Sequence, residues 1–129
     1  MSPLTNMKTA EKTELYDHAK MIAENITNGI EVQADEFDHI EYGYQPGDIL
    51  NGLHYLEDAL DFRYLVDSSG DLLQVQILVA FGGPNIWVHL WRDGSGEVCA
   101  FWWGDHATAP IYADAMGIFE ACEQIWECK

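Results

Sequence analysis

A histidine and two carboxylates that could together bind a metal ion lie close to one another in the sequence. Glu57 and Asp58 follow His54 by three and four residues, so the three would share one face of a helix. Metal sites use this spacing, but they need further ligands from other segments, for which His89 and His106 are the candidates. Because nothing in the sequence brings these segments together, we interpret the three as surface residues and predict no metal and no cofactor. A small metal-dependent hydrolase built on them is the alternative.

Other possible catalytic groups give no stronger indication. Cys99 and His89 fall on neighbouring predicted strands and could be adjacent, but we interpret them as a structural pair inside a packed sheet rather than as a pair for nucleophilic catalysis. The segment Gly82-Gly83-Pro84-Asn85 joins two predicted strands and opens no helix, so it lacks the N–H groups that bind phosphate. We therefore predict no catalytic residue and expect a protein that is not an enzyme.

The most informative property is charge. Six Lys and Arg residues stand against 22 Asp and Glu, which gives a formal net charge of −16. Such a field repels nucleic acids and anionic membranes and attracts basic protein surfaces. Between Glu31 and Asp71 all charged residues are acidic except Arg63, and aromatic residues alternate with them. A solvated acidic surface is the plain alternative to a binding surface.

Carboxylates with aromatic anchors suit a groove lined by Lys and Arg, because the charges steer association and the aromatic residues supply buried contacts. The sequence therefore predicts a partner-binding surface within residues 31–71. Its members are Asp35, Glu36, Asp38, Glu41, Tyr44, Asp48, Glu57, Asp58 and Asp61.

Four segments rich in β-branched and aromatic residues follow one another, separated by turn-forming clusters. They cover residues 62–66, 72–81, 86–91 and 97–103 and predict four antiparallel strands in meander order. In the longest one, alternation puts five residues on the face toward the core: Leu73, Val75, Ile77, Val79 and Phe81.

The last two of these strands are apolar on both faces. The face opposite the core would carry Trp87, Trp91, Phe101 and Trp103, which is more aromatic surface than a solvated sheet usually exposes. We expect a helix to cover it. The alternative is an interaction surface, including one that forms a homodimer.

Three helices complete the predicted fold. The first runs from about residue 10 to 27 after a cap at Thr9, the second from a cap at Asp48 to about residue 60, and the third over residues 112–126. The predicted class is α+β, a four-stranded antiparallel meander sheet packed with two N-terminal helices and one C-terminal helix.

The length of 129 residues suits a single domain, 1–129, with residues 1–8 frayed. We find no segment apolar enough to cross a membrane and no export signal. Three cysteines without CxxC spacing argue against a disulfide framework and a zinc site, so we expect buried free thiols and a cytoplasmic location.

Two motifs carry a resemblance to known proteins. Gly82-Gly83-Pro84-Asn85 before an aromatic strand, and Trp102-Trp103-Gly104-Asp105 closing the next strand, resemble small uncharacterised proteins of phages and mobile elements over about residues 48–110. Size and acidity also resemble anti-CRISPR and antirestriction proteins, several of which mimic nucleic acid. The resemblance implies an anti-defence function and transfers no catalytic residue.

Charge and resemblance together favour an inhibitor that is not an enzyme. It would bind a basic nucleic-acid-binding protein or nuclease complex in the host cytoplasm and exclude DNA or RNA, without binding nucleic acid or membrane itself. An immunity protein or antitoxin against a nuclease makes the same physical prediction.

Overall fold

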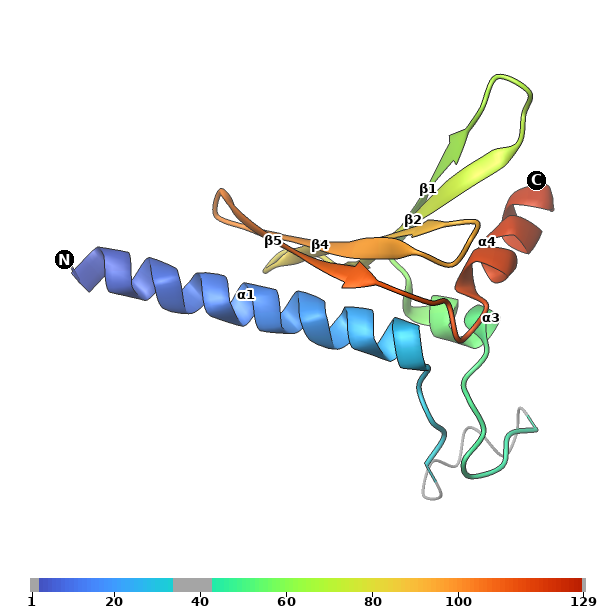
Figure 1. Ribbon diagram of the computed structural model, residues 1–129, viewed down its shortest axis with the longest axis horizontal. Coiled ribbons are helices and arrows are strands. Elements are labelled where there is room, and N and C mark those ends of the chain that lie inside the picture. Colours follow the sequence, from blue (N-terminus) through green and yellow to red (C-terminus); the bar gives the residue numbers. More distant parts are fainter. Residues whose placement is uncertain (1–2, 34–42, 129) are drawn as a thin grey trace.

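The chain folds into one antiparallel sheet with helices on one of its faces (Figure 1). The computed structural model describes residues 3–33 and 43–128, with side chains described from residue 14 onwards. The sheet has five strands in the order β1-β2-β3-β4-β5. In chain order the elements are α1 (Pro3–Asn28), α3 (Gly52–Tyr55), the 3₁₀ turn η1 (Leu56–Asp58), β1 (Asp61–Val66), β2 (Leu72–Ala80), β3 (Asn85–Trp91), β4 (Gly96–Trp102), β5 (Asp105–Ile111) and α4 (Ile118–Glu127).

The core lies between one face of the sheet and the helices. A row of paired residues crosses this face from strand to strand, namely Phe62, Ile77, Val88, Val98 and Ala109. Buried residues of α1 and α4 belong to the same cluster as this row. The α+β class and the antiparallel meander are thus confirmed.

The apolar stripe predicted for the first helix is confirmed. Leu15, Ala19 and Ile26 are buried, and α1 lies along β4 and β5 (Figure 1). The predicted start is wrong, because the helix already runs from Pro3 and passes through Thr9 without a cap there. Its end is as expected: Gly29 has a φ of 87°, and its N–H donates to the carbonyl of Asn25.

The prediction of a second helix from Asp48 to about residue 60 is wrong. Residues 48–50 run extended, because Val32 donates to the carbonyl of Asp48 and Leu50 donates to that of Ile30. The helical turn therefore begins only at Gly52, after Asn51, whose side-chain oxygen accepts from the N–H of His54. Backbone pairing with residues 30–32 thus keeps the first residues of the predicted helix out of a helical conformation.

A fifth strand, β5, occupies residues that we predicted to lead away from the sheet. It pairs with β4 from Asp105 opposite Trp102 to Ile111 opposite Gly96. Its core-facing residues are the small Ala107 and Ala109 and, at its end, the buried Ile111, so the alternation was weak in the sequence. Pro110 is compatible with an edge strand, because the free edge needs no N–H donor.

Two irregularities in β2 correct the alternation predicted for it. The register of β2 with β1 shifts near Leu73, and the register of β2 with β3 shifts near Val79. Each shift turns the next residue to the other face. Val75 and Ile77 face the core as predicted, whereas Leu73 and Phe81 are exposed.

The C-terminal helix starts later than predicted, at Ile118 rather than near residue 112. Asp114 accepts from the N–H groups of Ile118 and Phe119, and Gly117 just before the helix has a φ of 70°. These contacts satisfy the first donors of the helix, so it cannot extend further back. Among the described residues, none of the helices combines the length and the apolarity needed to cross a membrane.

Candidate protein-binding face

The face of the sheet opposite the core carries no helix among the described residues. We call it the helix-free face, and it consists of the side chains in register with Trp87, His89 and Trp91 of β3. It holds Trp87, Trp91 and Phe101 as predicted, whereas Trp103 lies at a hairpin tip with its ring centre 5.6 Å from that of Trp102. The predicted helical cover is wrong for the described residues, because α1, α3 and α4 all join the core on the other side. Trp91 and Phe101 are 42% and 46% exposed.

A cation of the chain itself already lies on this face. The guanidinium carbon of Arg63 on β1 sits 4.5 Å from the centre of the Trp87 ring. Beside them, the side chain of Gln76 donates to that of Gln74 over 2.8 Å. The aromatic surface of the sheet is therefore arranged so that it can hold a guanidinium group.

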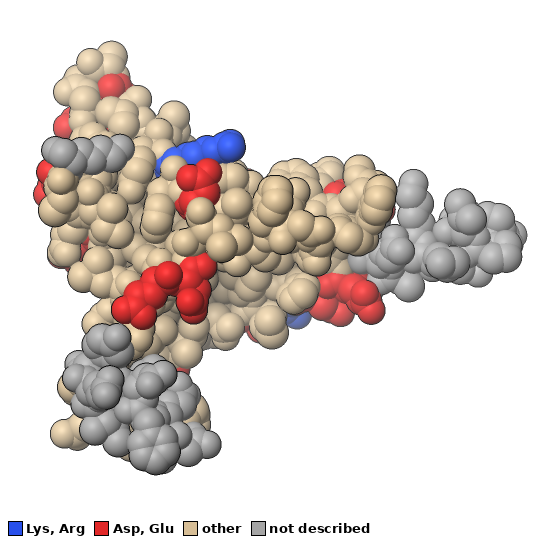
Figure 2. All heavy atoms as spheres, turned by 180° about the vertical axis from the view of Figure 1, so that it is seen from behind, with Lys and Arg blue, Asp and Glu red and all other residues tan. Residues whose placement is uncertain are grey.

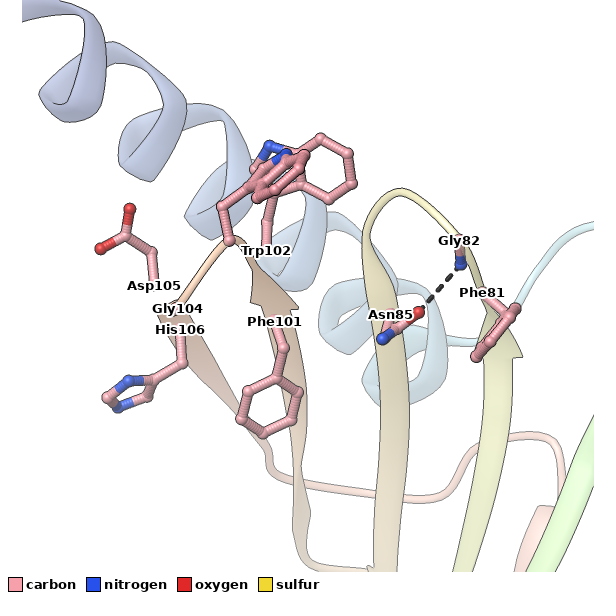
Figure 3. A pocket seen from close by; sticks show the side chains of 9 residues that line it. Phe81, Gly82, Asn85, Phe101, Trp102, Gly104, Asp105 and His106 are labelled. Atoms are coloured by element: carbon pink, nitrogen blue, oxygen red, sulfur yellow. Dashed lines mark hydrogen bonds between the residues drawn. The ribbon is translucent and has the colours of Figure 1, made fainter. Parts of the chain in front are cut away.

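At one end of the sheet the helix-free face continues into an open pocket of about 560 Å³. The turn after β2 and the hairpin between β4 and β5 form its walls, and Phe81, Phe101, Trp103 and His106 line it. Figure 3 shows Phe101 and His106 next to each other on one side of their strands, with Trp102 on the opposite side toward α1. The Phe101 and His106 rings are stacked with their centres 6.3 Å apart.

Trp103 has an unusual conformation in this pocket. It has a φ of 50° and is 81% exposed, at the tip of a tight hairpin that Gly104 continues with a φ of 81°. Asn, Asp or Gly is the usual residue there, and a bulky side chain in this conformation costs about 1 kcal/mol or more. The edge-to-face contact of its ring with that of Trp102, with centres 5.6 Å apart, offsets part of this cost.

Seven of the eight predicted acidic site residues fall into two groups. Four of them lie outside the described residues: Asp35, Glu36, Asp38 and Glu41. Glu57, Asp58 and Asp61 are exposed at the start of β1, and Asp61 is paired with Leu78 on the row that continues to Trp87. Figure 2 shows acidic side chains in several separate groups, with little basic surface between them.

Two further predicted site residues have structural contacts in the loop before α3. The carboxylate of Asp48 accepts from the N–H of Gln45 over 2.8 Å. The hydroxyl of Tyr44 accepts from the N–H of Asn51, and its ring lies 5.5 Å from that of His54. These contacts order the loop, so the carboxylates best placed to meet a partner are those next to β1.

The possible metal site at His54 is not completed by the structure. Its Nε2 lies 3.5 Å from the Glu57 carboxylate, and both line a pocket of about 500 Å³ with Asp58. Within residues 14–33 and 43–128, however, the ligand atoms that converge to within 4.8 Å belong to a different group, His89, Glu97 and Cys99. The geometry gives no support to a hydrolase centred on His54.

Cys99 and His89 are adjacent, as the sequence allowed. The Cys99 sulfur lies 4.0 Å from Nδ1 of His89, on the helix-free face rather than in the core. Burial, followed by the nearby Glu97 carboxylate, raises the pKa of the Cys99 thiol to about 11. Burial also lowers the pKa of His89. A protonated thiol beside a neutral imidazole is a poor nucleophile, so the pair is not set up for covalent catalysis.

The sequence prediction missed the pocket residues Phe81 and His106 as members of the candidate site. Phe81 was assigned to the core, because the sequence pattern does not reveal the bulge in β2. His106 was missed as a pocket residue because β5 was not predicted. Comparison of the chain with family models, curated proteins and solved structures found no match.

Proposed function

We propose that this protein is an inhibitor, not an enzyme, that binds a basic nucleic-acid-binding protein and excludes DNA or RNA from it. The observation that supports this most directly is the helix-free aromatic face on a chain whose net charge is −16. An aromatic centre with carboxylates beside it is the composition of a surface that binds Arg- and Lys-rich partners.

The aromatic residues supply the contacts that would bury most surface. Trp91 and Phe101 present flat, exposed rings on rigid strands, so little conformational entropy is lost when a partner covers them. The pocket at Trp103 would take an Arg or Lys side chain of the partner, much as Trp87 holds Arg63.

The carboxylates act at longer range. Asp61 lies on the helix-free face at the start of β1, and Glu57 and Asp58 are exposed in the 3₁₀ turn η1 just before it. All three would pair with cations around the partner's groove. The net charge would accelerate association with a basic surface and would oppose association with nucleic acid.

Charge also favours a basic partner over a second copy of the chain. Two copies of charge −16 that meet at this face would repel each other, whereas a basic groove would be attracted. A homodimer through this face is therefore an outcome that the experiments must distinguish.

The proposal is tested by competition. Purified nucleases and other basic DNA- or RNA-binding proteins are loaded with a fluorescent oligonucleotide, and its release is followed by anisotropy as this protein is added. We expect release from at least one of them, at concentrations that rise with salt. Trp91→Ser and Phe101→Ser should each weaken the effect at least about tenfold, and reversing Glu57, Asp58 and Asp61 to Lys should weaken it and reduce its dependence on salt.

Matched controls lie elsewhere on the surface. Tyr112→Ser removes an aromatic side chain that is 77% exposed just after β5, and Asp17→Lys reverses an exposed charge on α1. Both should leave the competition unchanged. If no nucleic acid is released, or if the controls and the face variants behave alike, the proposed function is wrong. A concentration-dependent dimer that the Trp91 variant abolishes would instead identify a second copy as the occupant.

A further inference from the structure

Three side chains capable of binding a metal converge in the middle of the helix-free face. His89 lies on β3, and Glu97 and Cys99 lie on β4. One ligand atom from each of them lies within 4.8 Å of the other two, and the Cys99 sulfur lies 4.0 Å from Nδ1 of His89.

The strand register produces this convergence. His89 is the direct cross-strand partner of Glu97, so their side chains leave the same face of the sheet. Cys99 follows Glu97 by two residues and therefore points to that face as well. All three stand on inner strands of the sheet, because β3 and β4 each have a hydrogen-bonded neighbour on both sides. The cluster is thus held by the most constrained part of the backbone.

We propose that His89, Glu97 and Cys99 form a three-ligand site for Zn²⁺ on the helix-free face. An imidazole nitrogen, a thiolate and a carboxylate oxygen are the three ligand types that zinc uses in proteins, and a cation that prefers only oxygen ligands would not select this set. Because the Cys99 thiol is protonated without metal, Zn²⁺ would displace its proton to solvent on binding. With bonds of about 2.0–2.3 Å, tetrahedral ligands lie roughly 3.5 Å apart. The side chains would therefore need to close by about half an ångström between the sulfur and the imidazole nitrogen, and by at most about 1.3 Å for any pair.

Access to this site is one-sided. Cys99 is buried and His89 half-buried, whereas Glu97 is exposed, so an ion would enter from solvent past the carboxylate. With three protein ligands, the fourth tetrahedral position would face solvent and take a water molecule. The site depends on the strand register alone and would exist whether or not the protein has the inhibitory function proposed above.

The site is tested with metal alone, on protein first stripped with a chelator. The background variant is Cys128→Ser, which removes the exposed thiol near the C-terminus. Isothermal titration with Zn²⁺ should give one ion per chain. Titration with Co²⁺ should give visible d–d bands of tetrahedral intensity together with a thiolate-to-cobalt charge-transfer band, which requires the cysteine as a ligand.

Variants assign the ligands. Cys99→Ser, His89→Gln and Glu97→Gln should each weaken Zn²⁺ binding at least about tenfold, and Cys99→Ser should abolish the charge-transfer band. Glu97 is exposed, so its variant should fold normally, and circular dichroism checks this for all three. Glu57→Gln, which alters the other histidine–carboxylate pair, should leave binding unchanged.

Three results would overturn the proposal. One is the absence of Zn²⁺ binding at micromolar concentrations. Another is binding that survives Cys99→Ser and Glu97→Gln together. The third is binding that Glu57→Gln removes instead. None of these results bears on the oligonucleotide competition, so the two proposals can fail separately.

Discussion

Replacing a leucine by alanine should have very different effects on the two faces of this sheet. Leu90 on β3 is 0% exposed and faces the helices, whereas Leu65 on β1 is 43% exposed and lies on the row of the helix-free face that continues through Gln74 to Trp91. The chemistry of the two changes is identical. Any difference in their effect on folding therefore measures how completely each face is packed.

The expected magnitudes follow from burial. Leu90→Ala removes buried carbon atoms and leaves a cavity, which costs about 2–5 kcal/mol. Its cross-strand neighbour on β4 is Gly96, which has no side chain to fill the space, so we expect a cost of at least about 3 kcal/mol. Leu65→Ala loses part of a transfer free energy and leaves no enclosed cavity, so it should cost roughly 1 kcal/mol.

Urea denaturation followed by circular dichroism measures both free energies of unfolding. In thermal unfolding, Leu90→Ala should lower Tm by roughly 10 °C and Leu65→Ala by only a few degrees. Equal costs for the two variants would show that the helix-free face is covered in solution. The proposal of a free binding surface would then lose its basis.

Three further predictions concern other parts of the chain. Gly52→Ala should cost about 2–3 kcal/mol, because the added Cβ would lie 2.5 Å from the carbonyl oxygen of Gly117, while Leu53→Ala at a half-exposed position should cost about 1 kcal/mol or less in the same urea assay. Burial raises the pKa of Tyr55 to about 12, above its unfolded value of 10.0. The stability that it contributes is therefore complete below pH 10 and falls by about 1 kcal/mol per pH unit between pH 10 and pH 12. Tyr55→Phe should remove this part of the alkaline loss of stability, measured by urea titrations at several pH values. The exposed Cys128 should react with a thiol reagent in the native protein, whereas Cys122, 0% exposed and with its pKa raised to about 12 by burial, should react only after unfolding, as mass spectrometry of the labelled peptides would show.

The parts of the fold that followed from the sequence are those where local pattern and tertiary packing agree. The stripe of α1 and the strands β1 to β4 were predictable because their apolar residues repeat at the period of the element. The alternation also put Trp87 and Trp91 on the face opposite the core. What it could not show is that none of the described helices covers them, because α4 packs on the core side near β2.

The misassigned parts depend on contacts between distant residues. Asp48 was predicted to cap a helix that Ile49 would begin, but the backbone of residues 48–50 pairs with residues 30–32 instead. The bulges of β2 are set by its partners on both sides. Local periodicity contains neither piece of information.

The His89–Glu97–Cys99 group could likewise not be predicted as a metal site from local sequence. Linear spacing argued against a zinc site because no pair of cysteines has CxxC spacing, and that argument concerns ligands that come from one loop. Here the ligands come from two strands, and only the pairing of His89 with Glu97 brings them together. A register shift of one residue would put His89 on the core side and dismantle the group.

An open aromatic sheet face would promote self-association unless something opposes it, and the high negative net charge of this protein does so. Exposed apolar rings on an open sheet invite other copies to stack, and a free strand edge invites them to pair. A net charge of −16 opposes both, and the edge strand β5 carries Pro110, which offers no N–H donor. Under the function proposed above, the acidity would keep copies of the chain from covering the face, and it would favour those partners whose positive charge reverses the repulsion.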